Sequence, residues 1–102
     1  MAKILALYKT PKDSAAFDGY YAATHAPLAR TMPGLREFKV SKGPVNGPDG
    51  PSGYHMVAIL DFDSLSSLQA ALASAEGQAT VADIGNFADG GCDVYFIEER
   101  EP

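Results

Sequence analysis

Four runs of apolar residues mark strands along the 102-residue chain. They cover residues 3–8, 35–41, 54–62 and 92–97, and glycine, proline or other turn residues separate them from the segments between. Short apolar runs bounded in this way are typical of β-strands. The pattern therefore predicts four strands, of which residues 54–62 form the longest.

Residues between the first two strands repeat at helical spacing. Large apolar and aromatic side chains recur at steps of three and four, which predicts a helix over residues 14–25. Asp13 is the expected N-cap. Pro27 disfavours helical geometry at Ala26, so the helix is expected to end at His25. Its expected buried face comprises Phe17, Tyr20, Tyr21, Thr24 and Leu28.

A second helical pattern follows the third strand. Asp63 or Ser64 is the expected cap, and Gly77 is expected to interrupt the helix. The apolar stripe consists of Leu65, Leu68 and Leu72, continued after the glycine by Val81, Ile84 and Phe87. Gly90 and Gly91 then turn the chain into the last strand.

The segment 43–53 connects the second and third strands. Seven of its eleven residues are Gly or Pro, which excludes the interior of a helix or strand and favours a long hairpin connection. The element order is then β-α-β-β-α-β. This order predicts a ferredoxin-like α+β fold, with a four-stranded antiparallel sheet and two helical segments on one face.

Both faces of the predicted sheet are apolar. The first strand places Ile4 and Ala6 on one side and Leu5 and Leu7 on the other. Two helices can cover only one face, and the other would be a large exposed apolar patch. A homodimer in which two sheets pack against each other as a barrel is the simplest solution. The alternative is a monomer with an imperfect pattern, in which one face of the sheet is partly exposed to solvent.

Composition narrows the function classes. Hydrophobic residues make up 46% and charged residues 21%, as expected for a single globular domain over residues 1–102. The formal net charge of −5 disfavours nucleic acid and anionic membrane surfaces as partners. No apolar stretch is long enough for a membrane span or a signal peptide, so a cytoplasmic location is expected. The single cysteine, Cys92, cannot form an internal disulfide.

The two histidines are the main candidates for chemistry. His25 is expected near the C-terminal end of the first helix, where the helix dipole favours a protonated ring, and Tyr21 lies four residues earlier on the same face. Histidine is the usual general acid or base near neutral pH. A purely structural ring that locks the helix end is an equal alternative. His55 opens the third strand, which favours a structural or interface role.

The remaining candidates are weaker. Five tyrosines could offer hydroxyls to a ligand, although most are expected to fill core edges. Asp61 is expected to be exposed or paired, and Cys92, beside Asp93, is expected at the core or a strand edge. Neither metal-ligand spacing nor a phosphate-binding glycine motif is present, so no metal and no cofactor are expected.

Several segments together resemble the EthD family, within the dimeric α+β barrel superfamily. The most specific is Thr24-His25-Ala26-Pro27-Leu28-Ala29, followed by Met32-Pro33-Gly34-Leu35. Others are Ile4-Leu5-Ala6-Leu7-Tyr8, Phe17-Asp18-Gly19-Tyr20-Tyr21, Tyr54-His55, Phe62-Asp63-Ser64, residues 70–77 and Asn86-Phe87-Ala88. The resemblance covers nearly the whole chain and implies a ferredoxin-like monomer that dimerises through its sheet.

The resemblance also implies a functional context. The family's namesake belongs to an operon for ethyl tert-butyl ether degradation, and superfamily members include muconolactone isomerases, polyketide cyclases and cofactor-free monooxygenases. These relatives share a pocket between sheet and helices, so a pocket role carries over to the motif histidine, His25.

The leading hypothesis is cofactor-free acid/base chemistry on a small ether, aromatic or lactone metabolite. His25 would move the proton, and Tyr21 would act with it. Tyr54, His55 and Phe17 are the candidate substrate contacts. One alternative is a non-catalytic accessory protein that holds a hydrophobic intermediate of a catabolic pathway. A purely structural dimerisation module is the other.

Overall fold

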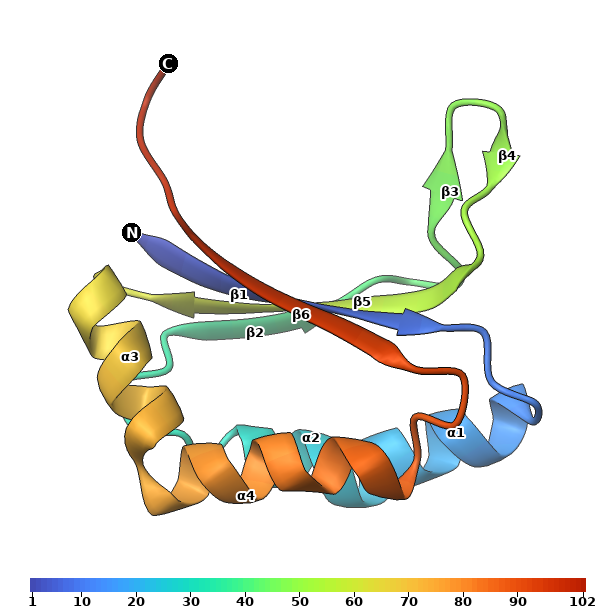
Figure 1. The fold of residues 1–102 in the computed structure, drawn as a ribbon, viewed down its shortest axis with the longest axis horizontal. Helices are drawn as coiled ribbons and strands as arrows, with labels where there is room; N and C mark the ends of the chain where they lie inside the picture. Colours follow the sequence, from blue (N-terminus) through green and yellow to red (C-terminus); the bar gives the residue numbers. More distant parts are fainter.

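The computed structural model describes all 102 residues and shows the predicted element order. Four strands form one antiparallel sheet in the order β2-β5-β1-β6. Their bounds are Ala2–Lys9 (β1), Glu37–Val40 (β2), Tyr54–Phe62 (β5) and Cys92–Glu98 (β6). Figure 1 shows the helices on one side of this sheet, as in a ferredoxin-like α+β fold. The predicted fold class is confirmed.

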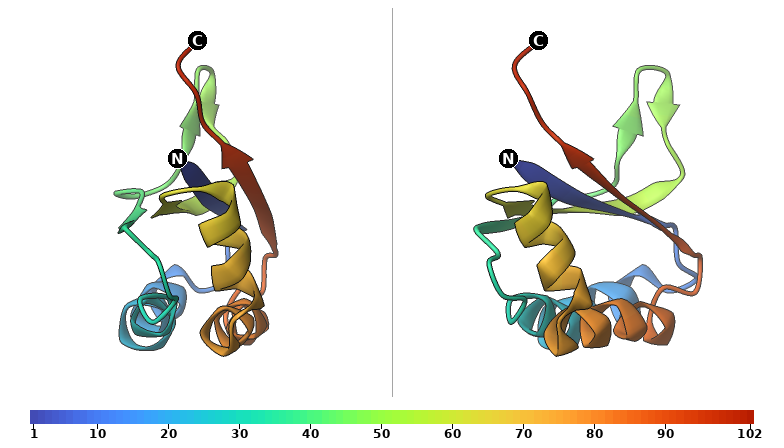
Figure 2. Two further views of the ribbon diagram at one scale, coloured as in Figure 1. Left: turned by 90° about the vertical axis from the view of Figure 1, so that its left-hand side faces the viewer. Right: turned by 60° about the vertical axis from the view of Figure 1, so that its left-hand side comes forward.

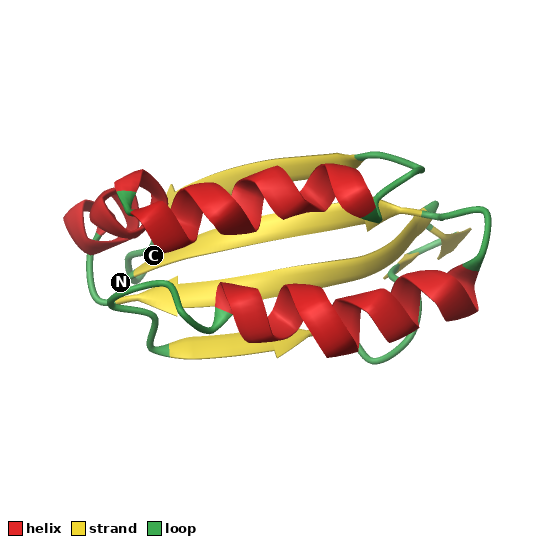
Figure 3. Ribbon diagram, turned by 90° about the horizontal axis from the view of Figure 1, so that it is seen from below, coloured by secondary structure: helices red, strands yellow, loops and turns green.

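Two helical rods cover this side of the sheet. The first consists of α1 (Ser14–Tyr20), the π-helical turn η1 (Tyr21–His25) and α2 (Ala26–Ala29). The second is bent and consists of α3 (Leu65–Ala73), α4 (Ala75–Asp83) and the 3-10 turn η2 (Ile84–Asn86), with α3 at a steep angle to α4 (Figure 1). Seen from below, α4 and the first rod lie side by side and run along the strands (Figure 3).

The first helix does not end at His25, so this prediction is wrong. The backbone continues in helical geometry through Ala26, with φ −61° and ψ −45°, into α2. The N–H of Ala26 bonds to the carbonyl of Tyr21, five residues back, which makes η1 a π-turn. This wider turn accommodates Pro27, whose ring would meet the carbonyl of Ala23 in a regular α-helix.

The π-turn also changes which side chains the first rod buries. Thr24, expected on the buried face, is exposed, and His25 is buried instead. His25 therefore lies in the middle of a helical rod and not at its C-terminal end. The charged group that faces the ring is Asp83 of the second rod.

The second helix breaks at Ser74 and not at Gly77. Ser74 is extended, with ψ 161°, and its hydroxyl accepts the N–H of Gly77 at 3.0 Å as the N-cap of α4. A Cβ on Gly77 would lie 2.0 Å from the carbonyl oxygen of Ala71. The glycine is thus needed for the close approach of α3 and α4. The expected caps Asp13 and Ser64 are confirmed.

The glycine- and proline-rich connection forms a small hairpin of its own. It contains β3 (Asn46–Gly47) and β4 (Gly50–Pro51), each only two residues long. The hairpin and the C-terminal tail both project to the side of the sheet opposite the helices (Figures 1 and 2). The long hairpin connection is as predicted, whereas the two short strands within it are not.

The sheet has one covered and one uncovered face. On the two central strands, β1 and β5, the helices bury the side chains of one parity, such as Ile4 and Ala58. The other parity places Leu5 beside Ile59 and Tyr95, and no helix covers these residues. Tyr95 is 59% exposed. The two-sided apolar pattern is therefore present in the folded chain. No helix is long and apolar enough to cross a bilayer.

Candidate functional site

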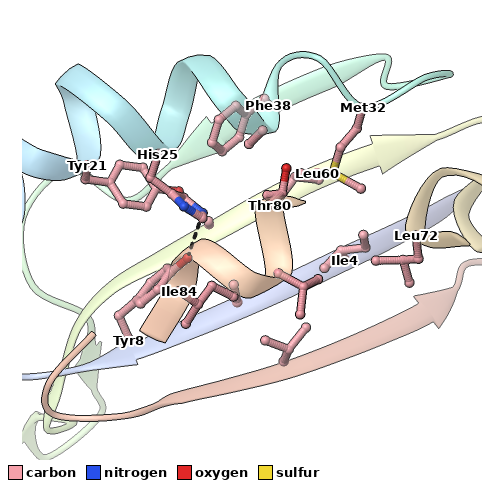
Figure 4. A pocket seen from close by; sticks show the side chains of 15 residues that line it. Ile4, Tyr8, Tyr21, His25, Met32, Phe38, Leu60, Leu72, Thr80 and Ile84 are labelled. Carbon is pink, nitrogen blue, oxygen red and sulfur yellow. Dashed lines mark hydrogen bonds between the residues drawn. The ribbon is translucent and has the colours of Figure 1, made fainter. Parts of the chain in front are cut away.

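A narrow cavity lies between the covered face of the sheet and the two rods (Figure 4). Its volume is about 40 Å³. Thirteen of the fifteen lining residues are hydrophobic. The lining consists of Ile4, Ala6, Tyr8, Tyr21, His25, Ala29, Met32, Phe38, Ala58, Leu60, Leu72, Thr80, Val81, Ile84 and Val94.

His25 is the polar group held most firmly at this cavity. The π-turn directs its ring inward, and the residue is only 3% exposed. Its Nδ1 lies 2.8 Å from Oδ2 of Asp83, the last residue of α4. The pair therefore joins the two rods at the wall of the cavity.

Asp83 is ionised at neutral pH although it is buried. Burial acts to raise the pKa of Asp83, but hydrogen bonds from Tyr20, Asn86 and His25 outweigh it and leave the pKa below its usual value. The hydroxyl of Tyr20 donates to Oδ1 at 2.6 Å, and the side-chain amide of Asn86 donates to the same oxygen at 3.0 Å. These bonds fix the carboxylate and leave Oδ2 for His25.

The ionised carboxylate determines which nitrogen of His25 carries hydrogen. A carboxylate can only accept hydrogen bonds, so Nδ1 of His25 carries the proton and Nε2 carries the lone pair. The hydroxyl of Tyr8 donates to this Nε2 over a long 3.4 Å, the dashed line in Figure 4. Burial raises the pKa of Tyr8, so its hydroxyl stays protonated. A basic nitrogen and a neutral donor thus lie side by side.

Aromatic rings surround this pair. The ring of Phe87 lies 4.7 Å from that of His25, and the ring of Tyr21 lies 5.1 Å from it. Phe17 packs edge-on against Tyr8 at 5.4 Å. Such packing holds the rings in one orientation and keeps water away from the ion pair.

Comparison with known proteins decides the family. The model of the EthD domain matches residues 9–91. The chain belongs to the EthD family. It is 37% identical over 100 residues to an uncharacterized 11.0 kDa protein in the thcB-thcC intergenic region of Rhodococcus erythropolis, covering 98% of this chain and 96% of that protein.

Solved structures agree with this assignment. An EthD family protein from Bacillus halodurans superposes with a TM-score of 0.89 at 40% identity, over 98% of this chain and 99% of that one. SnoaB, a cofactor-independent oxygenase from Streptomyces nogalater, has a TM-score of 0.67 at 15% identity, over 99% of this chain and 94% of that one. The second likeness concerns the fold alone.

Tyr21 and His25, the expected catalytic pair, both line the cavity of this EthD protein. Tyr8, however, is the tyrosine that hydrogen-bonds to His25, and no hydrogen bond joins Tyr21 to the ring. In the sequence, Tyr8 follows Ile4 and Ala6 at every second position, which places its side chain on the same face of the first strand. This pattern could have indicated Tyr8 as a site residue. Asp83 was also not among the residues expected at the site. Its helical spacing from Thr80 and Phe87 could have indicated that it lies on the buried face.

The three expected substrate contacts lie outside the inner cavity. Phe17 is buried behind Tyr8, and the Nε2 of His55 lies 2.7 Å from Oδ1 of Asp18 on the first rod. A shift in the β1–β5 register at this point turns His55 toward the helices. Tyr54 donates its hydroxyl to Asp93 at 2.9 Å, and Asp93 belongs to the uncovered face by its register with Leu7.

The other ionisable groups play no part in the cavity. Burial, followed by the charge of Asp93, raises the pKa of the Cys92 thiol to about 11, in agreement with its expected place at a strand edge. Asp61 is buried and paired with Lys3 at 2.9 Å. No group of three or more His, Cys, Asp and Glu side chains could hold a metal ion.

Proposed function

We propose that this EthD protein binds a small, uncharged, oxygen-bearing apolar molecule and moves a proton on it with His25. The observation that supports this most strongly is the chain of buried groups from Asp83 through His25 to Tyr8. It ends at the cavity with a lone pair on Nε2 and a neutral hydroxyl beside it. An arrangement of this kind suits general acid/base catalysis without a cofactor.

The lining of the cavity favours an uncharged ligand. No lysine or arginine contributes to it, and the ionised Asp83 lies directly behind His25. An anionic carboxylate or phosphate would lose its hydration there without gaining a cation. A molecule with an apolar body and one ketone, lactone, ether or phenol oxygen matches the walls and the single polar end.

Proton abstraction beside a carbonyl illustrates the chemistry. The C–H bond breaks, its proton goes to Nε2 of His25, and the electron pair moves onto the carbonyl oxygen. The hydroxyl of Tyr8 then donates to that oxygen, and Asp83 stabilises the imidazolium through Nδ1. Return of the proton to another carbon gives an isomer. If a deuteron from D₂O first replaces the proton on Nε2, its transfer to the same carbon gives exchange.

Hydrogen–deuterium exchange tests this proposal without a known substrate. Cyclohexanone is incubated with the protein in D₂O, and loss of its α-proton signal is followed by NMR. The wild type should accelerate exchange, and His25→Gln should lower the rate roughly 100-fold, the contribution of one general base. His55→Gln is the matched control, because His55 lies outside the cavity, and it should keep the wild-type rate. Equal rates in all three proteins would contradict the catalytic proposal.

A binding protein without turnover is the second candidate. The predominantly apolar lining favours it, since such walls retain a hydrophobic molecule without reacting with it. The hydroxyl of Thr80, the other polar residue there, donates to the backbone carbonyl of Glu76 at 2.8 Å and is not free to attack a ligand. Saturable binding of cyclohexanone without exchange would favour this accessory role.

We also propose that the protein is a homodimer formed through the uncovered sheet face. The support is the row of apolar side chains that no helix covers: Leu5, Leu7, Val57, Ile59, Tyr95 and Ile97. A second copy presents the same patch, so a two-fold contact would bury both patches at once. The ligand cavity lies on the other face of each sheet and would remain separate from this contact.

A further inference from the structure

The inner cavity, as it stands, is too small for a ring-sized ligand. It offers about 40 Å³ for water-sized atoms. An apolar cavity that holds benzene has about 150 Å³. If the cavity is the ligand site, as proposed above, at least one side chain of its wall has to move when a ligand enters.

Tyr21 separates this cavity from two open grooves. One groove, of about 270 Å³ in the same measure, runs from Asp18 to Gly43, and the other, of about 260 Å³, is bordered by Arg30 and Phe38. Tyr21 is the one residue that lines the cavity and both grooves. Displacement of this single ring would therefore join all three spaces.

The ring of Tyr21 is held mainly by packing. The hydroxyl of Tyr8 is the one side-chain hydrogen-bond partner of its hydroxyl, whereas the hydroxyl of Tyr20 donates to the ionised Asp83. The nearest rings are those of His25 at 5.1 Å and of Tyr8 and Phe87, each at 5.7 Å. Burial raises the pKa of Tyr21, so the hydroxyl is neutral and the ring can move without transferring a charge.

The backbone beneath Tyr21 is also the irregular part of the rod. Tyr21 is the first residue of the π-turn, and Ala22, next to it, is exposed and borders both grooves. π-turns occur often at functional sites, where they interrupt the regular hydrogen bonding of a helix. The chain can therefore adjust here with less disturbance than within α1 or α4.

We propose that Tyr21 is the specificity-determining residue of the site. With its ring shifted but still between the cavity and the grooves, the site admits a single-ring molecule such as cyclohexanone or phenol. With the ring displaced, a ligand of more than one ring keeps its oxygen at His25 and extends along the outer side of η1 toward Val40. The ligand class is thus an elongate, uncharged molecule with its oxygen function at one end.

Phenol and 2-naphthol, uncharged at neutral pH and differing by one ring, are the probes for this proposal. Their dissociation constants are measured by calorimetry for the wild type and for Tyr21→Ala, Tyr21→Phe and Leu72→Ala. Tyr21→Ala should shift the preference toward 2-naphthol by at least tenfold, the size of discrimination that pocket shape provides. Tyr21→Phe keeps the ring and should keep the wild-type ratio.

Leu72→Ala is the matched control, because Leu72 lines the cavity but neither groove. This change enlarges the cavity without joining it to the grooves. It should leave the preference for 2-naphthol over phenol within twofold of that of the wild type. An equal shift in Leu72→Ala and Tyr21→Ala would overturn the assignment of Tyr21 and leave the proposed function intact. Failure of every variant to bind either probe would contradict both. If Tyr21→Ala does not fold, Tyr21→Leu serves in its place, with the same expected direction.

Discussion

The carboxylate of Asp83 and the imidazole of His25 lie 2.8 Å apart, although 58 positions separate them in the chain. Each comes from a different helical rod. His25 lines the cavity between the rods and the sheet, and Asp83 lies behind it. The bond fixes the proton on Nδ1 and turns Nε2 toward the cavity. The proposed acid/base chemistry depends on this one relationship.

Replacing Asp83 with asparagine should destabilise the fold in a pH-dependent way. The pKa of Asp83 is below its usual 3.8 in the folded chain, so its stabilising contribution is fully present above the unfolded-state value and is lost as pH falls through the folded one. The substitution removes the charged acceptor of three hydrogen bonds. It should therefore lower the free energy of unfolding by about 1–3 kcal/mol at pH 7. Urea unfolding at pH 7 and pH 3 measures this.

The exposed Asp49→Asn in the hairpin is the control for this change. It should unfold like the wild type at both pH values. A deficit in Asp83→Asn that stays the same from pH 7 to pH 3 would contradict the assigned ionisation of Asp83.

Tyr20→Phe should raise the pKa of Asp83. The Tyr20 hydroxyl makes the shortest hydrogen bond to this carboxylate, 2.6 Å, and favours its charged form. Titration of the carboxyl carbon by NMR should show the rise. Tyr95→Phe, at an exposed position on β6, should leave the titration unchanged. An unaltered curve in Tyr20→Phe would show that Tyr20 does not position the carboxylate.

Gly77→Ala should destabilise the junction between α3 and α4. The added methyl group would lie 2.0 Å from the carbonyl oxygen of Ala71, so the backbone would have to shift, at about 1–3 kcal/mol. At Gly85 a methyl group meets nothing within 4 Å, and Gly85→Ala should be neutral or stabilising by about 0.4–1 kcal/mol. Chemical denaturation compares the two, and equal midpoints would count against the close approach described above.

Leu5→Lys should convert the proposed dimer into a monomer. Leu5 lies at the centre of the uncovered face, between Ile59 and Tyr95, and a buried, unpaired lysine there would oppose association. Light scattering after size-exclusion chromatography gives the mass of each variant. Ala79→Lys, on the exposed side of α4 and away from the cavity, should remain dimeric. A folded wild-type monomer at micromolar concentration would refute the dimer.

The strands could be predicted because burial fixes their pattern residue by residue. The bounds of β5, Tyr54–Phe62, are those predicted, and the apolar residues of both parities correctly indicate two apolar faces. The helix ends at His25 and Gly77 were wrong for a different reason. Proline and glycine normally interrupt helices, but here a π-turn accommodates Pro27 and helix packing requires Gly77.

The candidate site could be predicted only in part. His25 stands out because the chain has two histidines, and Tyr21 lies one turn away on the same rod. Asp83 could not be paired with His25, because their contact depends on how the two rods lie across the sheet. For the same reason Tyr8, on β1, was not recognised as the tyrosine that reaches the imidazole.

Nitrogen-15 NMR of the two imidazole rings at high pH measures the key proton directly. His25 donates to Asp83 through Nδ1, whereas His55 faces Asp18 through Nε2, so the neutral rings should be opposite tautomers. Added cyclohexanone should shift only the Nε2 signal of His25. A proton on Nε2 of His25, or a ring that does not respond to the ketone, would contradict its role as the base in the cavity.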